Sequence, residues 1–267
     1  MLSRPLDTDK LRAEFASAKP FPYLKIDNFL DEQVARRIAS AYPSLDLAGR
    51  QGTTFAAVNE RKKIQICDSS KFASPVDELN RFLASADFLS GLSYITGISN
   101  VLADPELVGG GIHITGPGGH LDVHIDFNYI ENRDLHRRLN LLLYLNETWD
   151  PSWGGQFQLW NQDVTKCEAT FDPIFNRCVI FETSEISFHG VVPISPAAKQ
   201  PRRSFATYYY TRESPAHWTG KSHTTVFKAR PDEKVKAYVL MPAQNAKRVA
   251  KFGFDHLKKG VKALIRR

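Results

Sequence analysis

Four side chains that can bind a metal ion alternate along one short stretch of the sequence, GGHLDVHIDFN, residues 118–128. They are His120, Asp122, His124 and Asp126. In an extended strand the side chains repeat with a period of two, so all four are expected on one face and apolar residues on the other. Imidazole nitrogens and carboxylate oxygens gathered in this way indicate a metal site.

An H-x-D pair is informative only together with residues further along the chain. His189 stands in a strand-like run, SFHGVVP, and Arg202 opens a later one, RRSFATYYYT. Two imidazoles and one carboxylate can occupy one face of an octahedron and leave the opposite positions open, as in non-heme Fe(II) oxygenases. A structural zinc site needs four closed ligands, and calcium or magnesium needs more oxygens. The fork-shaped guanidinium of Arg202 is suited to binding a carboxylate group of a cosubstrate.

At these residues the chain resembles the 2-oxoglutarate and Fe(II)-dependent oxygenase family, in its prolyl-4-hydroxylase-like branch. The motifs that carry the resemblance lie roughly within residues 100–211 and occur in the order typical of the family. They read HID, YLNETWDPSWGGQFQLW, FHGVVP and RRSFATYYY. A looser likeness covers FPYLKIDNFLDEQVARRI. The ordered set is far more specific than any one of its members.

The resemblance implies a role for particular residues when it is carried over position by position. Arg202, assisted by Tyr144, is the implied partner of the C5 carboxylate of 2-oxoglutarate. The implied iron ligands are His124, Asp126 and His189. The implied residues of the cosubstrate pocket are Arg202, Tyr144, Ser204 and Asn140.

Two points stay open from the sequence alone. Arg203 is the alternative to Arg202 as the partner of the cosubstrate carboxylate, because a shift of one residue in the register of the strand would exchange the faces on which the two side chains lie. The R-x-S spacing favours Arg202. His120 and Asp122 lie one pleat before the implied ligands, and they serve either at the mouth of the barrel or as caps of a Gly-rich turn.

The resemblance also implies the reaction. It is that of a 2-oxoglutarate-dependent dioxygenase, which uses Fe(II) and O2 to hydroxylate an unactivated C–H bond while 2-oxoglutarate is decarboxylated to succinate and CO2. Ascorbate is the implied reductant for reactivation. The branch suggests a prolyl residue as the substrate. A sugar, a free amino acid or a lipid-linked glycan at the membrane surface is the alternative within the family.

Two alternatives belong to other classes of protein. One is a metal-dependent hydrolase, which the absence of an H-x-H-x-D-H motif and the presence of Arg202 disfavour. The other is a non-catalytic jelly-roll binding protein. We expect a small-molecule or peptidyl substrate and no nucleic-acid partner, and the sequence does not determine the oligomeric state.

The helices and strands that are expected from the sequence, and that must position these residues, indicate an α+β protein. Short β-branched and aromatic runs bounded by turn residues succeed one another after residue 99, which favours a double-stranded β-helix, a jelly-roll or cupin-like barrel. Before it, helices are expected at 9–18, capped by Thr8, at 32–43, capped by Asp31, and at 75–98. Shorter strands are expected at 22–30, 53–58 and 62–67. The barrel strands are expected at 110–115, 120–127, 138–146, 155–160, 166–172, 177–183, 187–194 and 202–211.

Composition and charge set the organisation of the whole chain. At 267 residues and 42% hydrophobic content, the chain can build a packed core. We expect an oxygenase domain over residues 1–215, with its jelly-roll core from about residue 100, and a C-terminal extension over 216–267. Residues 245–267 hold eight Lys or Arg against one Asp, a local charge of +7 that leaves −1 of the total of +6 for the rest.

This uneven charge bears on the partners and the location of the protein. A nucleic-acid groove would spread its basic residues over the folded body, so the concentrated charge argues against one. The tail instead predicts a basic amphipathic helix, which is either simply solvated or in contact with an anionic membrane surface or an acidic partner, and a solvated helix is the simplest of these interpretations. No segment resembles a signal peptide or a bilayer span, so we expect a cytoplasmic protein, with peripheral contact to the membrane through residues 245–267 as an open alternative.

Overall fold

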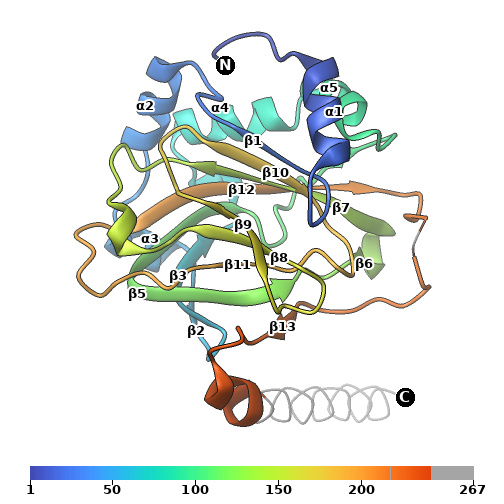
Figure 1. Ribbon diagram of the computed structural model, residues 1–267. Helices are drawn as coiled ribbons and strands as arrows, with labels where there is room; N and C mark the ends of the chain where they lie inside the picture. Colours follow the sequence, from blue (N-terminus) through green and yellow to red (C-terminus); the bar gives the residue numbers. More distant parts are fainter. Residues whose placement is uncertain (217, 242–267) are drawn as a thin grey trace, which may run out of the picture.

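The structure, a computed structural model, describes residues 1–216 and 218–241 (Figure 1). The basic helix expected over 245–267 lies outside the described residues. Within the described part, no helix is both long and apolar enough to cross a lipid bilayer. The helices are α1 (Thr8–Ser17), α2 (Glu32–Ser40), α3 (Leu45–Gln51), α4 (Ser74–Leu83) and α5 (Ala86–Thr96), with short turns at Ser69–Lys71, Glu131–Arg133, Pro151–Trp153 and Lys236–Leu240.

The strands form one curled antiparallel sheet. They are β1 (Tyr23–Ile26), β2 (Thr53–Ala56), β3 (Glu60–Ile66), β4 (Leu102–Ala103), β5 (Gly111–Ile125), β6 (Tyr129–Ile130), β7 (Leu135–Tyr144), β8 (Phe157–Trp160), β9 (Cys167–Phe171), β10 (Cys178–Glu182), β11 (His189–Val191), β12 (Arg202–Thr211) and β13 (Val226–Lys228). Their order along the main path is β1-β10-β7-β12-β5-β11-β8-β9, and β2, β3, β4, β6 and β13 branch from it.

Strand β5 carries the sheet from one layer of the barrel to the other. Its first residues, 111–115, pair with β12 and with β3. Its last residues pair with β11 and with β13. This arrangement of short antiparallel strands is a double-stranded β-helix, so the predicted fold class is confirmed.

Helices α1, α2, α4 and α5 cover one face of the layer that contains β1, β10, β7 and β12, whereas α3 lies against β3 and β5 (Figure 1). On β7, the odd-numbered leucines such as Leu141 pack into the helix-side core, while Leu142 belongs to a separate cluster inside the barrel. Asn140 and Tyr144 share the face of Leu142, because side chains repeat with a period of two. A strand that reads as almost continuously apolar therefore serves two cores and still presents polar groups to the interior.

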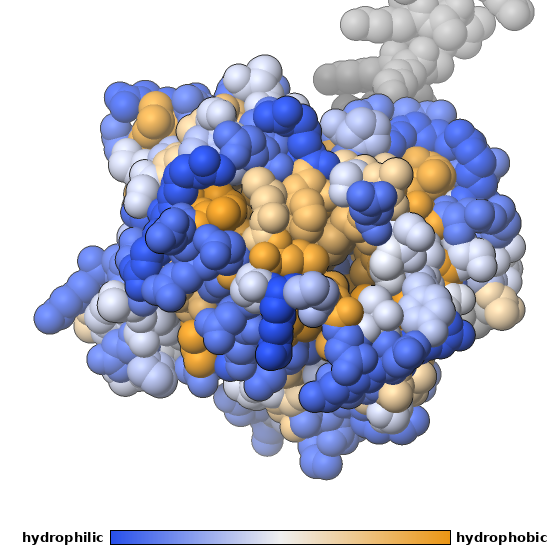
Figure 2. All heavy atoms as spheres, turned by 90° about the horizontal axis from the view of Figure 1, so that it is seen from above, coloured by the Kyte–Doolittle hydropathy of each residue, from blue (hydrophilic) through white to orange (hydrophobic). Residues whose placement is uncertain are grey.

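An apolar cavity lies on the helix side of the sheet. Figure 2 shows hydrophobic side chains gathered in the middle of the face seen from above. The cavity measures about 230 Å³, and α1, α5 and β1 contribute to its lining, which includes Leu6, Leu24, Phe88 and Ile95. It lies on the opposite face of the sheet from Leu142, so it is separate from the barrel interior.

Several expected boundaries were wrong. The helix expected over 75–98 is two helices, because Ser85 ends α4 and caps α5 through its hydroxyl. Asp7, not Thr8, caps α1. The first two expected barrel strands are one strand, β5. Helix α3 and strand β13 were missed, since seven and three residues are too few to show a periodic pattern.

The expectation that His120, Asp122, His124 and Asp126 share one face is also wrong. Between His189 and Val191 the register against β5 slips, so that His189 lies opposite His124 and Val191 opposite Leu121. One residue of β11 thus faces two of β5, which is a β-bulge. The bulge reverses the alternation, so Leu121 lines the barrel interior together with His124 and Asp126.

Candidate metal centre

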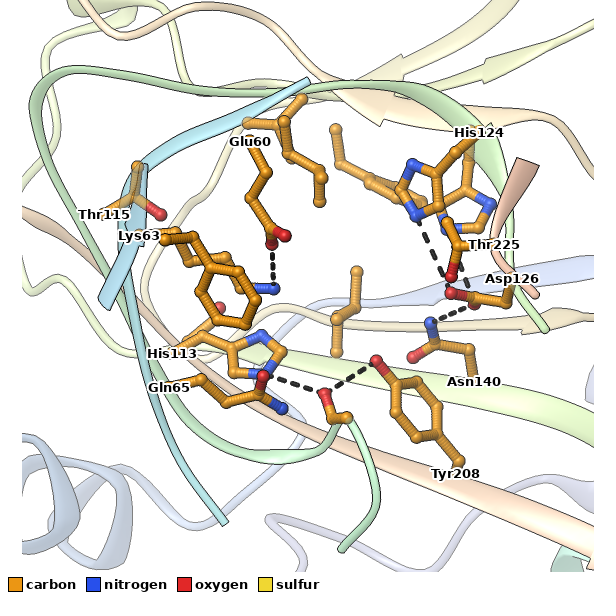
Figure 3. A pocket seen from close by; sticks show the side chains of 18 of the residues that line it. Glu60, Lys63, Gln65, His113, Thr115, His124, Asp126, Asn140, Tyr208 and Thr225 are labelled. Carbon is orange, nitrogen blue, oxygen red and sulfur yellow. Dashed lines mark hydrogen bonds and ion pairs between the residues drawn. The ribbon is translucent and has the colours of Figure 1, made fainter. Parts of the chain in front are cut away.

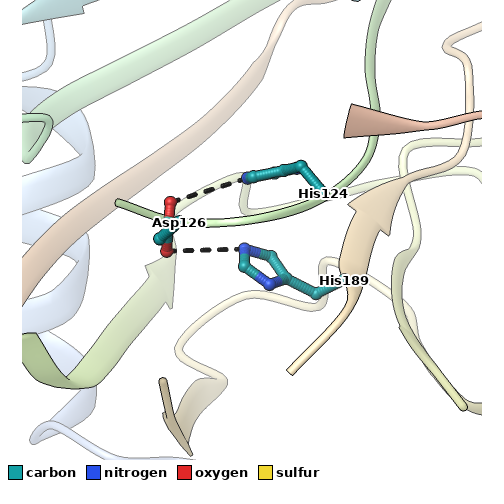
Figure 4. Close-up of side chains that lie close together, drawn as sticks. All are labelled: His124, Asp126 and His189. Atoms are coloured by element: carbon teal, nitrogen blue, oxygen red, sulfur yellow. Dashed lines mark ion pairs between the residues drawn. The ribbon is translucent and has the colours of Figure 1, made fainter. Parts of the chain in front are cut away.

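Three predicted side chains meet at the end of strand β5. His124 lies near its end, Asp126 comes directly after it, and His189 opens β11 opposite His124. The Nε2 atom of His124 lies 3.6 Å from Oδ1 of Asp126, and Nε2 of His189 lies 3.6 Å from Oδ2 (Figure 4). One ligand atom from each of the three residues falls within 4.8 Å of the others. This spacing suits three ligands on one face of a single ion.

Both imidazoles are oriented by the backbone. Nδ1 of His124 lies 2.8 Å from the carbonyl oxygen of Asp122, and Nδ1 of His189 lies 2.9 Å from that of Ser187. A carbonyl oxygen only accepts, so each Nδ1 carries the proton and donates it. Each Nε2 therefore presents a free lone pair toward Asp126. Metal-binding histidines are commonly held by such contacts.

Burial and charge prepare the cluster for a cation. Burial lowers the pKa of His189 to about 3, with a further contribution from His124, so its imidazole stays neutral near pH 7. Burial alone would raise the pKa of Asp126. The charge of the Arg137 guanidinium, 3.0 Å from its Oδ1, outweighs that effect together with the two neighbouring imidazoles and holds the pKa of Asp126 well below its usual range. The site thus offers the neutral nitrogen of His189 and the carboxylate of Asp126, beside the Nε2 atom of His124.

Arg137 was not predicted as part of the site. Its guanidinium is sandwiched between the rings of Phe127, at 3.9 Å, and Tyr208, at 3.6 Å. Such stacking stabilises a buried cation and fixes its orientation. Arg137 stands between His136 and Arg138 in the polar start of β7, so no local sequence pattern indicated its role. Arg137 neutralises the carboxylate of Asp126 and restricts its rotation.

The opposite end of the cavity is built around Arg202. This residue is 5% exposed. Its Nε donates to the carbonyl oxygen of Gly155 at 2.9 Å, and its Nη1 lies 3.4 Å from Oγ of Ser204. Gly155 has a φ of +78°, and a Cβ there would come within 3.2 Å of the Arg202 side chain. The second glycine of the WGG motif is therefore required by the close approach of the arginine.

Tyr144 lies beneath this guanidinium, with its ring 4.8 Å from the central carbon of Arg202. Burial raises the pKa of Tyr144 to about 12, so the hydroxyl remains a donor. Among the described residues this fully buried hydroxyl has no hydrogen-bond partner. A buried donor without a partner is costly, and a bound carboxylate would supply one. The residues at this end therefore fit the C5 carboxylate of 2-oxoglutarate.

One cavity of about 290 Å³ joins the metal cluster and the arginine (Figure 3). Asn140 lies on its floor, with Nδ2 3.5 Å from Oδ2 of Asp126. Across the cavity, His113 bonds the carbonyl oxygen of Gly109 at 3.0 Å, and burial holds the pKa of His113 well below its usual value. Further polar lining comes from Glu60, Lys63, Gln65, Thr115, Ser204, Tyr208 and Thr225.

The remaining predicted residues divide into those that line the cavity and those that do not. Arg202 lines the cavity, whereas Arg203 lies on the other face of β12 beside Tyr42. His120 bonds the carbonyl oxygen of Val58 at 2.9 Å and does not line the cavity. Asp122 is completely buried and points away, toward Lys236. Neither of the last two residues reaches the metal cluster, and Asp122 does not cap a turn.

Comparisons with known proteins agree with this geometry. Residues 110–210 match the family model of the 2OG-Fe(II) oxygenase superfamily. A prolyl hydroxylase from Trichoplax adhaerens, solved with a peptide fragment of a hypoxia inducible factor, is 21% identical, with a TM-score of 0.55 over 76% of this chain and 88% of that one. A prolyl-4-hydroxylase from Pseudomonas putida is 18% identical, with a TM-score of 0.54 over 78% and 100%.

A prolyl 4-hydroxylase from Phytophthora capsici is 17% identical, with a TM-score of 0.51 over 79% of this chain and 68% of that one. No curated protein sequence matches the chain significantly. The likeness to these structures establishes the fold, and the family match covers the strands that carry the metal cluster and Arg202.

The fold and the cluster define a double-stranded β-helix protein with a metal-binding triad. The chain matches the family model of the 2OG-Fe(II) oxygenase superfamily over residues 110–210, as predicted. It is a 2-oxoglutarate-dependent dioxygenase, with Fe(II) as its cofactor and 2-oxoglutarate and O2 as its cosubstrates.

Proposed function

We propose that this chain hydroxylates a prolyl residue of a peptide, with His124, Asp126 and His189 as the iron ligands and Arg202 as the anchor of 2-oxoglutarate. The observation that carries the proposal is the position of the triad and of the buried arginine at the two ends of one cavity. A hydrolase has no use for that arginine, and a binding protein has no use for three converging ligand atoms.

The protein residues divide the work of the reaction. Bound iron and 2-oxoglutarate supply the oxidation, in which O2 gives one oxygen atom to the new C–OH group and one to succinate as CO2 leaves. Arg202 and Tyr144 hold the far carboxylate, with Ser204 beside the guanidinium. Asn140 lines the cavity between the two ends and restrains Asp126. The apolar cluster around Phe157 and Phe181 excludes water from this interior.

The size and lining of the cavity support a peptidyl substrate. A volume of about 290 Å³ must hold the cosubstrate and leaves room for a small side chain, not for a whole large molecule. Phe55 and Phe227 contribute aromatic rings to its lining. The ring of a proline residue can pack against these two aromatic side chains, while the peptide backbone stays outside. The prolyl hydroxylases of similar fold support the same choice.

Two measurements test the proposal. Under anaerobic conditions, Fe(II) and 2-oxoglutarate added to the full chain should produce a weak visible charge-transfer band. With O2, proline-containing peptides should increase succinate formation and gain the mass of one oxygen atom, whereas the same peptides with alanine in place of proline should do neither. His124→Ala provides the blank.

The outcomes separate the alternatives. Absence of the band would contradict the iron and cosubstrate assignments. A normal band with succinate stimulated by sugars, free amino acids or lipid-linked glycans, and not by prolyl peptides, would overturn only the substrate.

A further inference from the structure

The chain returns to the metal site after the last strand of the barrel. Strand β13 pairs with the end of β5, so that Phe227 lies opposite His124. The Phe227 and His124 rings are 5.3 Å apart, with an angle of 36° between their planes. Phe227 and Thr225 both line the cavity, and Figure 3 places Thr225 beside His124 and Asp126. We call residues 221–236 the crossing segment.

The downstream end of the crossing segment is anchored on Asp122. The Asp122 side chain is fully buried, and Nζ of Lys236 lies 2.8 Å from its Oδ1. Arg230 lies 3.7 Å from the same oxygen and donates to the carbonyl oxygen of Val191 at 2.9 Å. A buried carboxylate without partners would be strongly unfavourable, so the segment and Asp122 need one another.

The upstream end is anchored on Asn128. Its Oδ1 accepts a hydrogen bond from the backbone N–H of His223 at 3.0 Å, and its Nδ2 donates to the carbonyl oxygen of Lys221 at 3.1 Å. The His223 ring also lies 2.8 Å from Glu185. The two anchors therefore stand on either side of the His124 and Asp126 pair in the sequence, and the segment between them crosses that pair.

We propose that the crossing segment is a fixed wall of the active site, in which Thr225 and Phe227 determine which substrates reach the metal, and that Asp122 is the positioning residue that holds this wall. The substrate then enters between Phe227 on one side and the β2–β3 hairpin, with Phe55 and Lys63, on the other. The role of the wall rests on the proposed function. The anchor on Asp122 does not, because it involves no metal.

This proposal explains the aspartate that the metal site leaves unused. The bulge in β5 turns Asp122 outward, while its backbone carbonyl still accepts the Nδ1 proton of His124. The same residue thus orients a metal-binding imidazole through its backbone and the wall of the site through its side chain. Its own replacement would disturb both, so the test removes its partner.

The first experiment measures hydrogen exchange in the metal-free full chain. Lys236→Met should accelerate exchange of the amides in Val226–Lys228 by about tenfold or more, because the anchored segment opens locally. Lys234→Met is the matched control, since Lys234 is exposed two residues away, and it should exchange like the wild type. Lys236→Arg keeps the charge and should restore protection. Unchanged exchange in Lys236→Met would overturn the anchor.

The second experiment measures access to the metal. Phe227→Ala should speed the removal of bound Co(II) by EDTA by about tenfold, because the ring that covers His124 is lost. Tyr238→Ala alters a side chain that is 81% exposed on the same part of the chain, and it should release Co(II) at the wild-type rate. Equal rates in Phe227→Ala and wild type would show that Phe227 does not bound the site. A wild-type protein that binds no metal would instead contradict the proposed function, and the exchange experiment would still decide the anchor.

Discussion

Arg202 and Tyr144, at the deep end of the cavity, stand on β12 and β7, two strands of ten residues that are each paired on both sides. Phe55 and Phe227, at the mouth, stand on strands of four and three residues that are each paired on one side. Backbone ladders therefore position the groups of the deep end, whereas side-chain ion pairs such as Lys236 with Asp122 position the mouth.

The difference has a consequence for substitutions. A changed side chain at the deep end removes a chemical group and leaves the scaffold in place, because the strand is held by its backbone. A changed side chain at the mouth should move the short strand itself, since side-chain contacts hold that strand in place. Binding of metal and cosubstrate should accordingly respond to the first kind of change, and choice of substrate to the second.

The largest effect is expected at the metal cluster. His124→Ala removes one of the three proposed ligands, so Fe(II) binding should be lost and 2-oxoglutarate turnover should fall by at least about a thousandfold. His120→Ala, on the same strand but outside the cavity, should retain both. Metal content and succinate formation measure the two variants. Equal losses in both would mean that the bulge does not separate their roles.

Arg202→Met tests the deep end directly. Loss of a buried guanidinium that pairs with a carboxylate costs about 2–5 kcal/mol, so the Kd for 2-oxoglutarate should rise by roughly 30- to 5,000-fold. Arg203→Met changes the neighbouring residue on the opposite face of β12 and should leave this Kd unchanged. Anaerobic titration of the charge-transfer band compares them. A higher Kd for 2-oxoglutarate in Arg203→Met and an unchanged Kd in Arg202→Met would contradict the register of β12.

The pH dependence of stability tests the burial of His189. Its pKa is about 3 in the folded protein, below the ordinary value of 6.5, so the folded state favours the neutral ring. This contribution to stability is complete above pH 6.5 and is lost as the pH falls from 6.5 toward 3. Between pH 8 and pH 5 it amounts to about 2 kcal/mol.

Urea unfolding of the metal-free wild type and of His189→Gln measures this difference, because glutamine does not titrate. The pKa of Asp126 is lowered, so its own effect belongs to more acidic solutions. Parallel stability profiles for the two proteins between pH 5 and pH 8 would contradict the buried, neutral imidazole.

The smallest effect is expected at the mouth. Lys63 pairs with Glu60 at 2.8 Å, and both side chains are largely shielded from solvent. Lys63→Met should leave metal and 2-oxoglutarate affinity unchanged, while KM for the peptide changes. Lys62→Met, on the outer side of the same strand, should leave KM as it is. A change in 2-oxoglutarate affinity in Lys63→Met would contradict the separate roles of the deep end and the mouth of the cavity.

The sequence alone predicted the class of fold and the three side chains that converge in the candidate metal cluster. Strand-like runs with a period of two and the ordered motifs around His124, His189 and Arg202 carry that information locally, because each motif needs only its own strand to form. The choice of Arg202 over Arg203 came from the R-x-S spacing of the family that the chain resembles.

Only the tertiary structure decided what surrounds that centre. The bulge that separates Asp122 from His124 depends on the pairing of β5 with β11, two strands distant in the sequence. Arg137 and Phe227 enter the site through long-range contacts that no local pattern encodes. Strand periodicity is a property of neighbouring residues, whereas a bulge, a buried ion pair and a three-residue strand exist only where two distant parts of the chain meet.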